Sequence, residues 1–184
     1  MTSHPARALV AHESLFGNTA ALAVAIARGL TRAGLDVDLL DVTQGVRPPR
    51  PQSSYDLLVV GAPTHAFTLS RASTRAQAVE QGAPADRAER GLRDWFEQLG
   101  ECEPGAEHAA AFDTRVAKMR HLPGSAAAKA ARVLHRHGYH LLDDPTSFYV
   151  TDAAGPLVRA ELVRTEKWGT RLAVRLADRA AVSR

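Results

Sequence analysis

The stretch that decides the fold is ALVAHESLFGNTAALAVAIARG, residues 8–29. At its start, Leu9 and Val10 stand among small apolar residues and predict a short buried strand. From residue 20 onward the apolar residues follow helical spacing, on a stripe made of Leu22, Ala25, Ile26, Gly29, Leu30 and Ala33. The turn between the two elements, residues 13–19, carries Ser14, Asn18 and Thr19 around Gly17.

The beginning of this helix is a predicted anion-binding site. The first N–H groups of a helix have no partners inside it, and the helix dipole adds partial positive charge there. The turn contains no Lys or Arg, so N–H and O–H donors would hold a phosphate, and Gly17 would allow its close approach. Neither a Walker loop nor the dinucleotide fingerprint GxGxxG is present. An ordinary helix start after a strand is the alternative interpretation.

Strands and helices alternate along the rest of the chain. Further strands are predicted at residues 35–40, 55–61 and 108–112, and a fifth at 140–142 and 147–150, interrupted at 143–145. Helices are predicted at residues 73–81, 91–99, 125–137 with Ser125 as N-cap, and from about Pro156. The last helix has a predicted apolar stripe of Val158, Leu162, Leu172, Leu176 and Ala180. This pattern predicts one α/β domain over residues 1–184, with helices on both faces of a five-stranded parallel sheet of order 2-1-3-4-5.

Ligands of such sheets bind beyond the carboxyl ends of the strands, where the strand order reverses. This rule selects three loops, namely residues 13–19, Pro63-Thr64-His65-Ala66-Phe67 and Phe112-Asp113-Thr114-Arg115. The segment at 68–87, which follows the second loop, is longer than a plain connection. We expect it to form a partial roof over the ligand.

The first loop, Glu13-Ser14-Leu15-Phe16-Gly17-Asn18-Thr19, resembles the phosphate loop of flavodoxins and flavodoxin-like FMN proteins. The other two loops stand where that family has its flavin loops. The resemblance implies a flavodoxin-like three-layer fold and an FMN cofactor. It also implies that the first loop holds the phosphate, with Ser14, Phe16, Gly17, Asn18 and Thr19 as its cofactor-binding residues, while the other two loops flank the ring. Small electron-carrying flavodoxins usually enclose the ring between Trp and Tyr, whereas the second loop here offers only His65 and Phe67.

Four basic side chains have open interpretations. His65 is the candidate catalytic residue because its ordinary pKa suits proton delivery to reduced flavin or a quinone, although it could equally pack or hydrogen-bond in the loop. Arg115 would either favour an anionic reduced ring or form a surface salt bridge. Arg71 and Arg75 could close over the flavin or bind the phosphate of a nicotinamide cofactor, but a solvated helical face is favoured.

The composition limits the classes of partner. Among 184 residues, 23 basic and 20 acidic residues give a net charge of +3, and RNA-binding signatures are missing, so no nucleic-acid partner is expected. No apolar run approaches the roughly 18 residues of a membrane span. With one cysteine, Cys102, and no apolar leader, a cytoplasmic protein is expected. No metal site is expected, because the spacing of His121, His135, His137 and His140 does not suit one.

The resemblance therefore implies an FMN-binding redox protein that exchanges electrons with a partner protein or reduces a small acceptor. An NAD(P)H-quinone reductase or a porphyrinogen oxidase of the flavodoxin type is one alternative. A binding or regulatory protein that has the flavodoxin fold but no flavin is another. The sequence does not predict an oligomeric state.

Overall fold

The computed structural model describes residues 5–48 and 55–182. The deciding stretch forms strand β1 (Arg7–His12) and helix α1 (Asn18–Arg32), as predicted. The other strands are β2 (Asp36–Asp41), β3 (Leu57–Pro63), β4 (His108–Val116), β5 (His140–Leu141) and β6 (Thr146–Val150). The other helices are α2 (Ala72–Glu80), α3 (Leu92–Phe96), α4 (Ala126–Arg136) and α5 (Glu161–Val182). Short 3-10 helices cover Val42–Gln44, Ala85–Arg87 and Ala117–Met119.

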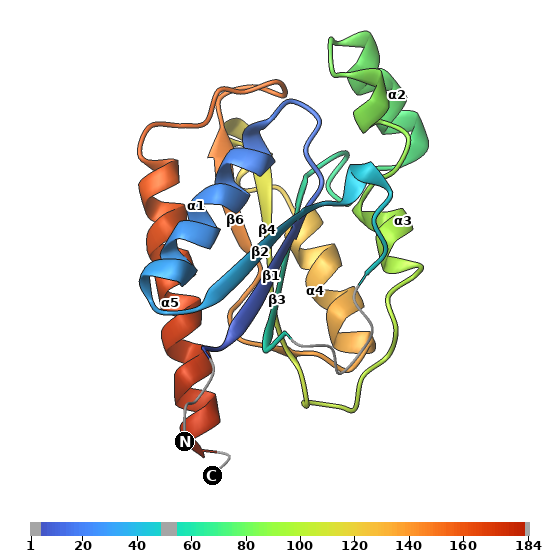
Figure 1. The fold of residues 1–184 in the computed structure, drawn as a ribbon. Coiled ribbons are helices and arrows are strands. Elements are labelled where there is room, and N and C mark those ends of the chain that lie inside the picture. The colour runs from blue at the N-terminus through green and yellow to red at the C-terminus, as the bar shows by residue number, and fades with distance from the viewer. Residues whose placement is uncertain (1–4, 49–54, 183–184) are drawn as a thin grey trace.

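The sheet is parallel throughout and has the predicted order, β2-β1-β3-β4-β5 (Figure 1). In its centre Val10 pairs with Leu39 on one side and Val59 on the other. The predicted fifth strand is in fact two strands, because β5 pairs with the start of β4 and β6 with its end. The sheet therefore has six strands, five of them along the predicted path.

Strand β4 is longer than the sequence pattern predicted. It pairs with β3 as far as Thr114 and with β6 as far as Val116, so Asp113, Thr114 and Arg115 belong to the strand. The interpretation of these residues as a loop was wrong. Because side chains alternate across a strand, Asp113 and Arg115 point to one face of the sheet, and Phe112 and Thr114 to the other.

Helices cover both faces of the sheet, as expected for this fold class (Figure 1). Helices α1 and α5 pack on one face, and α3 and α4 pack on the other. On the α1 and α5 face, the rings of Phe112, Phe148 and Trp168 meet edge to face, with centroids 5.8–6.3 Å apart. Ser125 caps α4 as predicted, since its Oγ accepts a hydrogen bond from the N–H of Ala128 at 3.1 Å.

Helix α5 begins at Glu161 rather than near Pro156. The preceding residues run back along β6 instead, where the Thr151 N–H donates to the Pro156 carbonyl at 2.9 Å. The predicted apolar stripe was also partly wrong, because Leu162 is 47% exposed and Trp168 is fully buried. Likewise, Ala180 on α5 is exposed, and so is Ala33, which follows α1. Among the described helices, α5 included, none has both the length and the apolar character needed to cross a membrane.

Helices α1 and α5 approach so closely at Gly29 that a larger residue does not fit. A Cβ added there would lie 2.1 Å from the carbonyl oxygen of Glu166 and 2.9 Å from the backbone nitrogen of Thr170. We therefore expect Gly29→Ala to lower the free energy of unfolding by about 1–3 kcal/mol. In an open helix the same change raises it by roughly 1 kcal/mol. Urea denaturation measures the sign of the change in the free energy of unfolding. A variant more stable than the unaltered protein would contradict the close packing of α1 against α5 at Gly29.

Candidate functional site

A cavity of about 250 Å³ lies at the carboxyl ends of β1, β3 and β4. The residues after β1 and the start of α1 form one side, through Ser14, Leu15, Phe16, Asn18 and Thr19. The turn after β3 contributes Pro63, Thr64, His65 and Ala66. The remaining lining comes from α2, from the end of β4 and from the region of β6. The cavity is thus where the strand order predicts a ligand.

The start of α1 offers hydrogen-bond donors to this cavity. No side chain caps the helix, and its first N–H groups have no partner within it. Gly17 precedes the helix with φ of 86°, a left-handed conformation that favours glycine. The Ser14 side chain is fully buried, and its Oγ has no hydrogen-bond partner among the described residues. A buried hydroxyl without a partner is costly and calls for a ligand or a water.

The side chains of Asn18 and Thr19 already have partners. The Asn18 Nδ2 donates to the carbonyl of Ala154 at 3.0 Å, which holds the loop after β6 against α1. The hydroxyls of Thr19 and Thr114 lie 2.9 Å apart, so only one of the two protons remains for a ligand. Asn18 can therefore offer a ligand its backbone N–H, whereas Ser14 can offer its side chain.

The turn after β3 is tight. The N–H of His65 donates to the Thr68 carbonyl at 2.9 Å, and the reverse bond is 3.0 Å long. Between them, Ala66 and Phe67 have φ of 45° and 65°, values that favour glycine or asparagine. Ala66 lines the cavity, but Phe67 does not line it and is 45% exposed. The structure therefore does not bring Phe67 to the cavity.

We expect Ala66→Gly to raise the free energy of unfolding by about 1 kcal/mol, because glycine adopts this left-handed conformation without strain. The matched control is Ala128→Gly inside α4, which should lower it by a similar amount. Urea denaturation of both variants provides the comparison. If Ala66→Gly were as destabilising as the control, the turn would not be strained.

Of the four residues predicted as a third loop, only Thr114 lines the cavity. Phe112 is fully buried in the core instead. Asp113 accepts hydrogen bonds through Oδ2 from the Ala127 N–H at 2.9 Å and from the Thr64 hydroxyl at 3.1 Å. Arg115 donates to the carbonyl of Leu122 and is 8% exposed, so neither a surface salt bridge nor a place in the cavity is observed.

His65 lines the cavity, but its environment does not favour a proton donor. Burial lowers the pKa of its imidazole, and the nearby positive charge of Arg75 lowers it further. The imidazolium that a general acid needs is thus less populated at neutral pH than in a free histidine. The neutral ring can still donate or accept a hydrogen bond.

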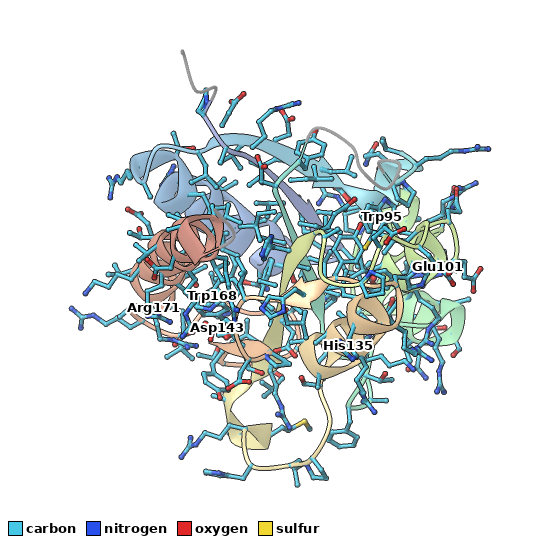
Figure 2. All side chains as sticks on the ribbon, turned by 90° about the horizontal axis from the view of Figure 1, so that it is seen from below. Trp95, Glu101, His135, Asp143, Trp168 and Arg171 are labelled. Atoms are coloured by element: carbon cyan, nitrogen blue, oxygen red, sulfur yellow. The ribbon has the colours of Figure 1, made fainter. Side chains whose placement is uncertain are left out.

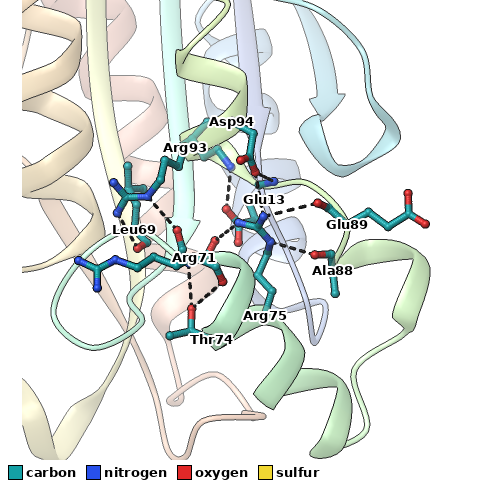
Figure 3. A network of polar contacts seen from close by, with 12 residues as sticks. Glu13, Leu69, Arg71, Thr74, Arg75, Ala88, Glu89, Arg93 and Asp94 are labelled. Carbon is teal, nitrogen blue, oxygen red and sulfur yellow. Dashed lines mark hydrogen bonds and ion pairs between the residues drawn. The ribbon is translucent and has the colours of Figure 1, made fainter.

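The favoured interpretation of Arg75 as part of a solvated face was wrong. Arg75 is 2% exposed, and its guanidinium donates to the Ala88 carbonyl at 2.9 Å, to Ser70 Oγ at 3.1 Å and to Asp94 Oδ2 at 2.9 Å (Figure 3). These bonds use the N–H donors of the Arg75 guanidinium, so the side chain is not available to bind the phosphate of a nicotinamide cofactor. Arg71, at the start of the same helix, is exposed, as that interpretation expected.

Glu13 joins the first loop to this network (Figure 3). Its carboxyl is fully buried, and Oε2 accepts a hydrogen bond from the Leu92 N–H at 2.7 Å. Burial raises the pKa of the Glu13 carboxyl, although the Leu92 N–H and the Arg75 charge oppose the shift. A Cβ at Gly91 would lie 2.6 Å from Glu13 Oε2 and 2.8 Å from Arg75 Nη1, so a larger residue there would displace one of these two side chains.

The segment at 68–87 was expected to cover the ligand in part, but which residues of α2 line the cavity was not predicted. Three residues of α2 and the residue that follows it line the cavity: Thr74, Gln77, Ala78 and Gln81. Their spacing of i, i+3, i+4 and i+7 places them on one helix face. This spacing was visible in the sequence, but the face is polar and did not stand out as a binding surface. The segment at 68–87 thus forms a wall of the cavity. Figure 1 shows α2 projecting beyond the sheet.

Other cavities are larger. One of about 580 Å³ lies at the amino ends of the strands, where Ala6 and His108 line it. Two more, of about 680 and 650 Å³, adjoin the C-terminal end of α4 and share His135, Arg136 and Leu141. A helix C-terminus carries partial negative charge, which does not suit an anionic ligand. The described residues contain no group of three side chains arranged to hold a metal ion. The cavity at the start of α1, in contrast, combines a helix N-terminus with a buried hydroxyl that has no partner among the described residues.

Comparison with solved structures finds flavodoxins whose fold is similar to that of this chain. A flavodoxin from the domain Archaea has a TM-score of 0.62 and 17% identity over 93% of this chain and 99% of its own. Oxidised Flavodoxin 1 from Bacillus cereus has a TM-score of 0.62 and 15% identity, over 92% of this chain and 98% of its own. The flavodoxin of Streptococcus pneumonia TIGR4 has a TM-score of 0.58 and 18% identity, and the match covers 95% of this chain and 99% of its own. No protein-family model and no curated protein sequence matches the chain.

The chain therefore has a flavodoxin-like α/β fold, as the alternation of strands and helices and the first loop predicted. At this level of identity the likeness establishes the architecture. The ligand and the chemistry have to be argued from the residues of the cavity.

Proposed function

We propose that the cavity binds FMN and that the protein is a redox protein, which passes electrons to a partner protein or to a small acceptor. The observation that carries this proposal is the buried Ser14 hydroxyl, which has no partner in the part of the chain that the structure describes and lies beside the uncapped start of α1. Such a site suits a phosphate. The similarity of the fold to flavodoxins supports FMN as the compound that carries it.

The residues of the cavity fit this ligand. Ser14, Thr19 and the first N–H groups of α1 would hold the phosphate. Gly17 does not line the cavity itself, but its left-handed conformation shapes the turn that leads into α1. Phe16, His65 and Ala66 would contact the flavin ring. The described residues that line the cavity include no Lys or Arg, so the phosphate would be held by neutral donors. When bound, FMN supplies reversible one- and two-electron chemistry, while the protein supplies binding and orientation.

The size of the cavity favours exchange of electrons over enclosed catalysis. Cavities that enclose a whole small molecule usually measure about 300–1,000 Å³, and this one measures about 250 Å³. Part of a bound FMN would therefore stay open to solvent and accessible to an acceptor. The absence of a cation from the lining also disfavours a site for NADPH, whose extra phosphate is commonly bound by arginine.

The experiment that tests this function uses the FMN-loaded protein, reduced without oxygen and mixed rapidly with benzoquinone. We expect rapid reoxidation, followed through the flavin absorbance, and no steady NADPH oxidation in the absence of another protein. Steady NADPH oxidation with the quinone would support the reductase alternative. Purified protein that stays colourless with added FMN would contradict the proposal and support a binding or regulatory role.

A further inference from the structure

The positive charge of the chain is concentrated in one segment. Residues 114–142 contain six Lys and Arg residues, four His residues and no Asp or Glu. The whole chain has a net charge of +3, so the remaining residues together carry a net charge of −3. The segment covers the end of β4, the loop after it, α4 and the start of β5. We call it the acid-free segment.

The described structure does not neutralise these charges internally. None of the six cations takes part in an ion pair among the described residues. On α4, Lys129, Arg132 and Arg136 follow one another at i, i+3 and i+7, and the two arginines donate only to carbonyls of their own helix. In the loop, Lys118 and Arg120 are exposed, and the Arg120 Nε donates to the imidazole of His121.

Large apolar side chains stand among the loop cations, next to the proposed FMN site. Met119 and Leu122 are 46% and 45% exposed, and Phe67 from the neighbouring turn is 45% exposed. The two segments touch, because a Cβ added to Gly124 would lie 3.2 Å from the Cβ of Phe67. Met119 also lines the cavity. Apolar side chains surrounded by charges are typical of protein interfaces.

We propose that the acid-free segment, together with Phe67, is the docking surface for an acidic protein partner. The unpaired cations attract a negatively charged partner, and Phe67, Met119 and Leu122 are buried once it is bound. A second copy of this chain fits poorly, because two such surfaces repel each other. The exposed apolar side chains favour a protein over a nucleic acid, whose binding depends chiefly on cations facing its phosphates.

This inference deepens the proposed function by naming the chemistry of the partner, but the surface itself lies outside the phosphate site. Its test is therefore direct binding, measured with and without FMN. The probe is a plant-type ferredoxin, a small acidic electron carrier, and basic cytochrome c is its counterpart. If the protein binds ferredoxin but does not bind FMN, the docking surface is supported and the proposed function is contradicted.

We expect the double variant Lys118→Glu, Arg120→Glu to slow association with ferredoxin about tenfold or more at low salt. Phe67→Ser should mainly speed dissociation, because it removes an apolar contact rather than a charge. The control is the pair of substitutions Lys167→Glu, Arg171→Glu on α5, which carries the same change in charge on the opposite face of the sheet. Figure 2 shows Arg171 well separated from His135 of α4. The control should bind ferredoxin at the rate of the unaltered protein.

Rising salt should slow association of the unaltered protein more than that of the double variant. Circular dichroism confirms that each variant is folded. Equal loss in the control and the double variant, or tighter binding of cytochrome c than of ferredoxin, would overturn the proposal. Self-association of the protein that Phe67→Ser abolishes would also overturn the proposal. So would binding of a single-stranded oligonucleotide that is tighter than binding of ferredoxin and is lost in the double variant.

Discussion

Replacing Arg75 by alanine is expected to lower the free energy of unfolding by about 3 kcal/mol or more, because the change breaks a buried charge network. Four groups would lose a donor at once, namely Ser70 Oγ, the carbonyls of Ala88 and Glu89, and the Asp94 carboxylate. The carboxyl of Glu13 would also lose the nearby positive charge that opposes its raised pKa. Urea denaturation measures the loss.

Arg71→Ala is the matched control for this prediction. Arg71 precedes the first turn of α2, is exposed, and takes part in the network of Figure 3 only through its backbone, which hydrogen-bonds with the Thr74 hydroxyl. Truncation of its side chain should change the free energy of unfolding by no more than about 0.5 kcal/mol. Equal effects of the two substitutions would show that the buried network does not stabilise the fold.

The second large effect concerns the first loop. Ser14→Ala and Thr19→Val should each weaken FMN binding about tenfold or more, because a lost hydrogen bond to a charged group costs about 1.5–3 kcal/mol. Riboflavin lacks the phosphate, so its affinity should hardly change. Isothermal titration of both ligands separates the two cases.

Thr170→Val serves as the control for these variants, because Thr170 lies on α5 and does not line the cavity. It should leave both affinities unchanged. If Ser14→Ala weakened FMN and riboflavin equally, the phosphate would bind elsewhere.

The parts of the fold that depend on local pattern could be predicted from the sequence. The change from a strand period to a helix period around Gly17 located β1, α1 and the loop between them. The strand order followed from the alternation of elements, and it selected the sheet edge where the cavity lies. Local signals also identified Ser125 as the cap of α4.

The features that were missed depend on contacts between distant segments. The length of β4 is set by its pairing with β3 and β6, which no local pattern shows. The start of α5 is displaced because the preceding residues pair with β6. Arg75 is buried by groups on another helix and its connecting loop, so a spacing that suggested a solvated face was misleading.

The roles of the site residues divide in the same way. Ser14 was identified from the loop itself, and the structure places it in the cavity with a free hydroxyl. Phe112 and Arg115 were included because they stand at or just after the predicted strand end. In the structure Phe112 is buried in the core within β4, and Arg115 points to the face of the sheet opposite Thr114. The wall formed by α2 required knowledge of where the long segment folds back.

Isothermal titration of the unaltered protein with FMN and with riboflavin tests the central claim most directly. The account predicts saturable binding of one FMN per chain, at least about tenfold tighter than binding of riboflavin, since the phosphate contributes charge-assisted hydrogen bonds at the start of α1. Saturation should also turn the protein yellow. No saturable FMN binding, or equal affinity for the two ligands, would contradict the claim that this cavity is a phosphate-anchored flavin site.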